Sequence, residues 1–250
     1  EEFVQGKEEQ CFELTKMLLD VLCNEKVEKD FISDMREIYN SKGFDQGWYE
    51  VLRDFSLNYD PSLSGRVFTD LDKLEKFIEY VLAGYRKEGI SPLPNIMFTR
   101  DLGISIGNSM IITWASKKVR NPENIIAKHI IKNHSLFAKC NIYDFHENHP
   151  DLALEGGDVT LINEEVIAIG VSERTSKASV EAITPFLYEN GIKYIMCFKM
   201  PEERRFMHQD TIFSIININE AIVFHPFFRD GGEKELSVDI ITTGKNGPTS

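Results

Sequence analysis

The sequence predicts an α/β fold in which repeated strand–strand–helix–strand units follow a helical N-terminal region. Three observations predict this fold. Apolar residues recur at helical spacing over roughly the first 90 residues. Beyond them, a short apolar strand, a polar turn and a second strand occur three times in succession, each time after an aspartate. Acidic and basic side chains gather directly before the first strand of each copy.

The N-terminal region is predicted to be a small helical bundle spanning residues 1–90. Its apolar residues form stripes that we expect to pack against one another. The stripes are Leu14, Leu18 and Leu22; Val27, Phe31, Met35 and Ile38; and, after Thr69 as an N-cap, Leu71, Leu74, Phe77, Ile78, Val81 and Leu82. The pattern changes at Ser91-Pro92-Leu93-Pro94, so residues 91–250 are predicted to form a second domain.

An internal repeat organises the second domain. The three copies begin at Asp101, Asp158 and Asp210, which gives steps of 57 residues (101 to 158) and 52 residues (158 to 210). A regular step of this size predicts a radial or stacked arrangement of similar units.

Each of the first two hairpins is followed by a predicted helix and a third strand. Asn121-Pro122 is a typical helix start, and the strand "CNIYDF" follows that helix. The second helix is expected from about Ser176, with Gly191 as its C-terminal glycine, before the strand "IKYIMCF". The unit is therefore β-β-α-β, with two full copies and the start of a third.

Composition and charge limit the function. The net charge of −12 argues against binding nucleic acid, because phosphates would be repelled. No apolar run approaches the roughly 20 residues of a membrane helix, so no membrane partner is expected. The few cysteines and the lack of a signal-peptide pattern predict a reducing, cytoplasmic location. Cys11, Cys23 and Cys197 fall in apolar segments and are predicted to be core residues.

The polar residues before each first strand are candidates for one site. They are Arg100 and Asp101 in "FTRD", Glu155 to Asp158 in "EGGD", and His208 and Asp210 in "MHQD". If the units surround an axis, their equivalent ends meet. That arrangement would bring Asp101, Glu155, Asp158, His208 and Asp210 close together.

Several carboxylates in one place repel one another unless a positive charge lies between them. A metal ion held by histidine and carboxylates is one interpretation. A flat cation such as a guanidinium, which matches carboxylates two hydrogen bonds at a time, is the other. An aspartate at a strand start often only caps a turn, but its recurrence in three consecutive copies favours function. Gly156-Gly157 would let a ligand approach the backbone.

Two arginines occupy matched positions after the second strand of a hairpin, Arg120 in the first copy and Arg174 in the second. A matched pair predicts an anion site, such as one for an α-carboxylate. Carboxylates for one end of a ligand and arginines for the other describe a site for free arginine.

Four motifs, "PLPNIMFTRD", "EGGDVTL", "IGVSERT" and "FMHQDT", resemble in their order and spacing the bacterial-type arginine deiminases of the pentein superfamily. The resemblance covers residues from about 90 to 228. It implies a propeller of five β-β-α-β units with an inserted helical bundle. It also implies hydrolysis of L-arginine to L-citrulline and ammonia through a covalent amidino-thioether, with no metal and no cofactor.

The resemblance also implies roles for individual residues. Asp101 and Asp210 would bind the guanidinium, and Glu155 and His208 would be catalytic, with His208 as general acid and then base. Asn95, Arg120 and Arg174 would bind the amino-acid end of the substrate, and Phe98 would pack against it.

The nucleophile that the resemblance requires is a cysteine in a Gly-rich segment near the C-terminus. None of Cys11, Cys23, Cys140 and Cys197 has such a context, so we expect the nucleophile outside this chain and negligible turnover by these residues alone. The unit before the helical insert is also expected elsewhere, and exposed strands at the break would favour a homo-oligomer. An amidinotransferase, another guanidine hydrolase of the superfamily, and a non-catalytic arginine-binding homologue stay open as alternatives.

Overall fold

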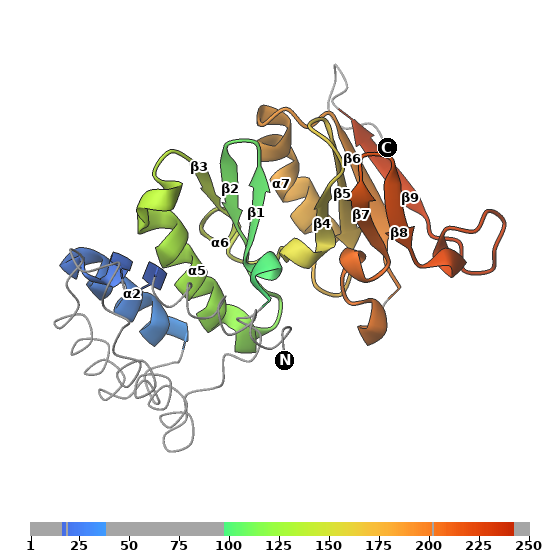
Figure 1. Cartoon of the computed structure of the whole chain (residues 1–250). Coiled ribbons are helices and arrows are strands. Elements are labelled where there is room, and N and C mark those ends of the chain that lie inside the picture. Colours follow the sequence, from blue (N-terminus) through green and yellow to red (C-terminus); the bar gives the residue numbers. More distant parts are fainter. Residues whose placement is uncertain (1–16, 19, 39–97, 202, 243–250) are drawn as a thin grey trace, which may run out of the picture. The chain divides into compact units, whose positions relative to one another are not determined.

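The computed structural model of the 250-residue chain describes residues 17–18, 20–38, 98–201 and 203–242 (Figure 1). The chain divides into two compact units, residues 1–97 with 119–138 and residues 98–118 with 139–250. Most of the predicted bundle, including the helix after Thr69, lies outside the described residues. The domain boundary near residue 90 therefore stays a prediction.

In the first unit, α2 (Glu25–Ile38) packs against α5 (Asn121–Asn133). Phe31 and Met35 are buried and Val27 is partly buried, which confirms the predicted apolar stripe at these three positions. Asp34 of α2 accepts a hydrogen bond from the ring of His129 at 3.0 Å and one from Lys128 at 2.9 Å. The hydrogen bond with His129, supported by Lys128, outweighs burial and lowers the pKa of Asp34 to about 2.

The described strands of the second unit form three separate sheets. The first has the order β1-β2-β3, the second β4-β5-β6-β9, and the third is the hairpin β7-β8. Their bounds are Gly103–Ile106 (β1), Ser109–Ile112 (β2), Asn141–Asp144 (β3), Val159–Leu161 (β4), Val166–Val171 (β5), Tyr194–Lys199 (β6), Phe213–Asn217 (β7), Glu220–Val223 (β8) and Val238–Thr242 (β9). In each larger sheet an antiparallel hairpin is extended by a parallel third strand.

The predicted order strand–strand–helix–strand is confirmed twice, as β1-β2-α5-β3 and as β4-β5-α7-β6. Helix α7 (Lys177–Glu189) begins after Ser176, whose hydroxyl accepts from the N–H of Ser179. Gly191 follows it with φ +91°, a left-handed conformation that favours glycine. The chain is thus a mixed α/β protein whose sheets, within the described residues, do not close into a ring.

Strand β9 was not predicted from the sequence. It pairs antiparallel with β6, Cys197 facing Asp239 in the register, and so extends the sheet of the second copy. Its β-branched sequence VDIIT is a weak strand signal. Only the sheet that it joins shows that residues after the third hairpin return to the second copy.

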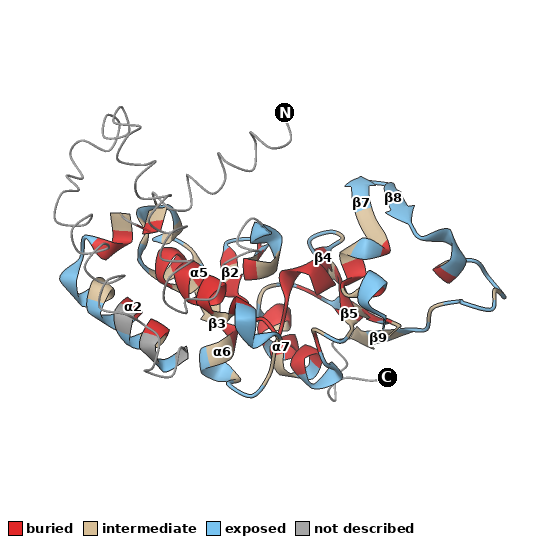
Figure 2. Cartoon of the chain, turned by 90° about the horizontal axis from the view of Figure 1, so that it is seen from below, coloured by how far each residue is buried: buried red, intermediate tan, exposed pale blue. Residues whose placement is uncertain are grey.

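One apolar core lies between the two larger sheets and α7. Its side chains include Ile104, Ile111, Phe145, Leu154, Ile167, Ile169, Val180, Ile183, Leu187 and Ile195. Figure 2 shows buried residues along α7 and in β4 and β5. Because residues of both sheets share this core, the starts of β1 and β4 are held at fixed positions.

The described cysteines correct one prediction. Cys23 is exposed, not buried, because it follows the helical residues 20–22 in a turn. Cys197 is buried in β6, as predicted, and burial with the charge of Asp239 raises its pKa to about 11. The Cys197 sulfur is therefore a thiol at neutral pH, which suits a core residue and not a nucleophile.

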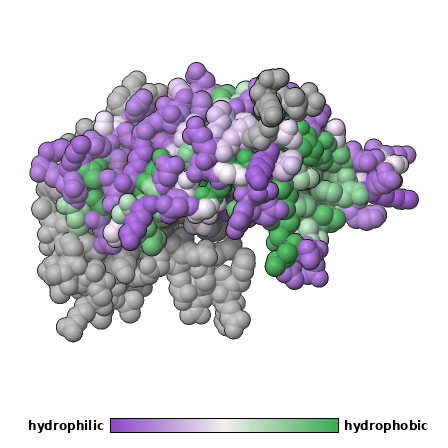
Figure 3. Space-filling view, turned by 90° about the horizontal axis from the view of Figure 1, so that it is seen from above, coloured by the Kyte–Doolittle hydropathy of each residue, from purple (hydrophilic) through white to green (hydrophobic). Residues whose placement is uncertain are grey.

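The hairpin β7-β8 exposes large apolar side chains, with Ile216, Ile218 and Ile222 at 59%, 94% and 62% relative exposure. Figure 3 shows hydrophobic residues gathered on the surface of the C-terminal part of the second unit. In the part of the chain that the structure describes, no helix has both the length and the apolar character to cross a membrane.

Candidate functional site

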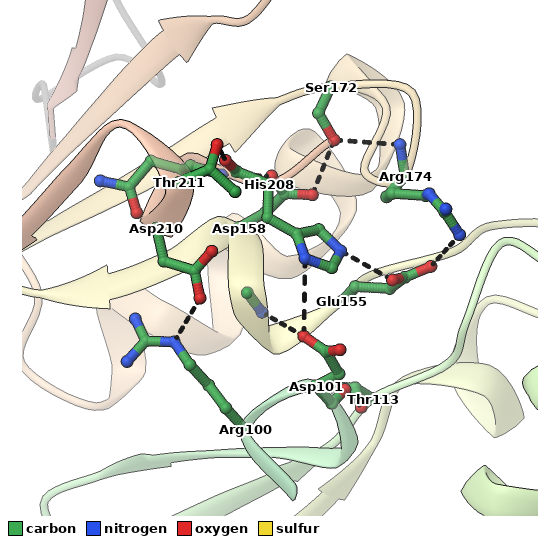
Figure 4. A network of polar contacts seen from close by, with 12 residues as sticks. Arg100, Asp101, Thr113, Glu155, Asp158, Ser172, Arg174, His208, Asp210 and Thr211 are labelled. Carbon is green, nitrogen blue, oxygen red and sulfur yellow. Dashed lines mark hydrogen bonds and ion pairs between the residues drawn. The ribbon is translucent and has the colours of Figure 1, made fainter. Parts of the chain in front are cut away.

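Three short 3₁₀ turns of the second unit carry the polar residues that precede each hairpin. They are η3 (Thr99–Leu102) before β1, η6 (Gly156–Asp158) before β4, and η8 (Gln209–Thr211) before β7. The turns lie against one another, η6 contacting both of the others. The equivalent ends therefore meet as predicted, although the first and third segments are more than 100 residues apart in sequence (Figure 4).

The glycine pair in η6 makes this approach sterically allowed. A Cβ on Gly156 would lie 2.0 Å from the carbonyl oxygen of Arg100, and one on Gly157 would lie 2.5 Å from Nδ1 of His208. The Gly157 N–H donates to Oδ1 of Asp101 at 3.1 Å. The glycines thus accommodate the neighbouring turns, whereas the sequence had suggested room for a ligand.

Glu155 and His208 form the centre of the site. Nε2 of His208 lies 2.8 Å from Oε2 of Glu155, and the Glu155 side chain has no exposed surface. Trp114 and Leu154 form an isolated antiparallel bridge. This bridge brings Ser116 near Glu155, and the Ser116 N–H donates to the second carboxylate oxygen at 2.9 Å.

The environment of this pair favours the charged form of both residues. Burial raises the pKa of Glu155, but hydrogen bonds from His208 and Ser116, with the charge of Arg174, outweigh it and hold that pKa below its ordinary value. Burial lowers the pKa of His208, yet the hydrogen bond to Glu155 and the Asp101 charge raise it above its ordinary value. Each member of the pair thus stabilises the charged form of the other.

Asp101 and Asp210 lie on the other side of His208 (Figure 4). Oδ1 of Asp101 is 3.7 Å from Nδ1 of His208. Oδ2 of Asp210 is 3.2 Å from Nε of Arg100, which the sequence placed among the polar residues before the first strand without indicating a partner for it. Burial raises the pKa of Asp210, while the charges of Arg100 and His208 lower it, and the net effect is a rise.

Asp158 faces the protein interior, and its contacts are structural. Its carboxylate accepts from the hydroxyl of Ser172 at 2.7 Å and from the N–H of Gln209 at 3.0 Å. Burial raises its pKa to about 7 despite these hydrogen bonds. The Asp158 carboxyl therefore ties η8 to the end of β5, which places His208 against Glu155.

The predicted ligand-binding residues occupy different positions. Arg174 is near the centre, with Nη1 3.8 Å from Oε1 of Glu155 and Nε 3.1 Å from Glu173. Phe98 is half-exposed at the start of η3.

Arg120 is buried in the first unit, where its Nε donates to Glu123 at 3.0 Å. Asn95 lies outside the described residues, and the roles of all four stay predictions.

The same centre has the geometry of a metal site. Among the described residues, Asp101, Glu155 and His208 bring one ligand atom each within 4.8 Å of one another. Histidine and carboxylate ligands suit several divalent cations. A cradle of carboxylates around an imidazolium also suits a flat organic cation, to which His208 could donate a proton. Both interpretations from the sequence are thus compatible with the geometry.

Comparison with known proteins favours one family. A family model for arginine deiminase matches residues 73–247. The curated arginine deiminase of Borrelia duttonii is 36% identical over 207 residues, covering 81% of this chain and 43% of that protein. The arginine deiminase of Bacillus cereus is 27% identical over 258 residues, covering 94% and 59%. The chain spans about half the length of the curated relatives it matches.

Solved structures show a remoter likeness. The N-terminal domain of ArgZ, a cyanobacterial arginine dihydrolase bound to its product, is 18% identical with a TM-score of 0.45, covering 64% of this chain and 55% of that one. DDAH from Pseudomonas aeruginosa, complexed with citrulline, is 17% identical with a TM-score of 0.42, covering 52% and 47%.

Proposed function

Because this chain belongs to the arginine deiminase family, we propose that its site binds the guanidinium of L-arginine and takes part in hydrolysing it to L-citrulline and ammonia. The observation that carries the proposal is the position of His208. Its imidazole contacts the buried Glu155 through Nε2 and approaches the carboxylate of Asp101 through Nδ1, and Asp210 lies nearby (Figure 4).

In the proposed complex, Asp101 and Asp210 bind the guanidinium through charge-assisted hydrogen bonds. Phe98 packs against the substrate chain, and Asn95, Arg120 and Arg174 bind its amino and carboxylate groups. Asp210 already forms an ion pair with the side chain of Arg100 within the protein. This ion pair supports the proposed affinity of Asp210 for a guanidinium.

In the proposed reaction, a cysteine thiolate supplied by a segment outside this chain adds to the guanidinium carbon and forms a C–S bond. His208 protonates the nitrogen that leaves as ammonia when its C–N bond breaks. The neutral imidazole then accepts a proton from water, whose oxygen attacks the amidino-thioether. The C–S bond breaks, citrulline leaves, and the thiolate is restored.

The full-length protein is further proposed to be a pentein propeller of five strand–strand–helix–strand units, with residues 1–90 as an inserted helical bundle and residues 91–250 as part of the propeller. Two such units and three matching turns support it. A cytoplasmic location is proposed from the cysteine usage, and homo-oligomer formation from the exposed hairpin β7-β8.

Citrulline formation by the full-length protein tests the activity. The unmodified protein should convert L-arginine to citrulline and ammonia in equal amounts, and Asp210→Ala should abolish arginine binding in calorimetry. Arg205→Gln is a matched control, because Arg205 is an exposed arginine paired with Glu203 outside the site. An Asp210→Ala variant that binds arginine normally would refute the proposed contact.

Metal removal separates the two interpretations of the centre. Activity that survives dialysis against a chelator is expected for a guanidinium site with a thiol nucleophile. A divalent ion bound in a one-to-one ratio, with activity lost on chelation and regained on adding the ion back, would instead show that Asp101, Glu155 and His208 hold a metal.

A further inference from the structure

Arg100 connects all three turns that build the site. It belongs to η3, and its Nε lies 3.2 Å from Oδ2 of Asp210, one residue into η8. Its Nη2 donates to the carbonyl oxygen of Val159 at 3.2 Å and to the hydroxyl of Thr160 at 3.1 Å, both at the start of β4. One guanidinium therefore joins the beginnings of all three repeats, and Figure 4 shows its contact with Asp210.

A second connection runs from the same guanidinium to η8. The Thr160 hydroxyl that accepts from Arg100 donates in turn to Oε1 of Gln209 at 2.7 Å. The backbone N–H of Gln209 donates to the buried Asp158. The segment from His208 to Asp210 is thus held through Asp210 directly and through Gln209 indirectly.

We propose that Arg100 is a positioning residue for substrate binding: it holds the Asp210 carboxylate in the orientation in which Asp210 can bind the substrate guanidinium. The inference rests on the proposed function of the site. Arg100 reaches Asp210 through Nε and the start of β4 through Nη2, so the guanidinium plane is fixed by two separate partners. A carboxylate held in this way keeps its orientation before the ligand arrives. Lysine at position 100 would keep the positive charge but could not span both partners, because its three donors sit on one nitrogen.

Steady-state kinetics of the full-length protein with L-arginine provides the test. Arg100→Gln should raise KM by about tenfold or more, the usual effect of losing a hydrogen bond to a charged group, and should change kcat less. Arg100→Lys should recover KM only in part. Arg205→Gln serves as the control and should match the unmodified protein.

A double-mutant cycle separates positioning from a general structural role. If Arg100 acts through Asp210, Arg100→Gln should add little to the defect of Asp210→Asn. Additive defects, or an Arg100→Gln variant with unchanged KM, would overturn the inference. Should Asp210→Asn also leave KM unchanged, the proposed function of the site fails as well. Because the Arg100 side chain is half-exposed, the variants should fold, and melting temperatures will verify it.

Discussion

Replacing Gly157 by Ala should inactivate the full-length protein while leaving it folded. The new Cβ would lie 2.5 Å from Nδ1 of His208 and 2.7 Å from Oδ1 of Asp101, whereas ordinary contacts begin near 3.4 Å. The imidazole must therefore recede by about 0.9 Å, the difference between 3.4 and 2.5 Å. A displacement of about 1 Å of a catalytic group costs on the order of 10²-fold in rate, or about 2.7 kcal/mol of activation free energy.

The assay for this prediction is citrulline formation measured together with thermal unfolding. Overpacking should lower the free energy of unfolding by about 1–3 kcal/mol. Gly107→Ala is the control: Gly107 has φ +55° in the β1-β2 turn, and an added Cβ there meets no atom within 4 Å. Gly107→Ala should lose stability through backbone strain but keep its activity. A Gly157→Ala variant whose kcat/KM stays within about threefold of the unmodified protein would refute the crowding argument.

Three further outcomes are expected. Glu155→Gln removes the partner that raises the pKa of His208. The imidazole then loses its proton at a lower pH, so the alkaline limb of the kcat profile should move to lower pH. An alkaline limb that does not move would contradict this role of Glu155. Asp34→Asn should reduce the free energy of unfolding by about 1–2 kcal/mol near pH 7. The hydrogen bond from His129 lowers the pKa of Asp34 to about 2. The stabilisation that Asp34 contributes is therefore present above pH ~4 and is lost as the pH falls towards ~2. If the unmodified protein and the variant differ in urea unfolding by the same amount at every pH, this reasoning is wrong. Ile216→Thr should reduce self-association of the 250-residue chain in sedimentation, because Ile216 is exposed on β7; an unchanged sedimentation profile would place the association elsewhere.

Local patterns in the sequence were sufficient for the two strand–strand–helix–strand units and for the location of the site, but not for strand β9. The apolar period of α2, the Ser176 cap of α7 and the Gly107 turn depend on residues a few positions apart. Such short-range preferences are visible in one sequence. The repeated Asp before each hairpin then indicated which loops carry the polar residues, and the turns that hold them do meet.

The chemistry inside the site was decided only by the tertiary structure. Glu155, 53 residues away in sequence, raises the pKa of His208, and Asp158 proved to be a buried anchor for η8. Arg100 gained a role only once its guanidinium was seen between Asp210 and β4. Protonation states depend on burial and on partners distant in sequence, and no local pattern encodes either. The sequence therefore determined which residues approach the centre, and the packing of three turns around two glycines decided what each of them can do there.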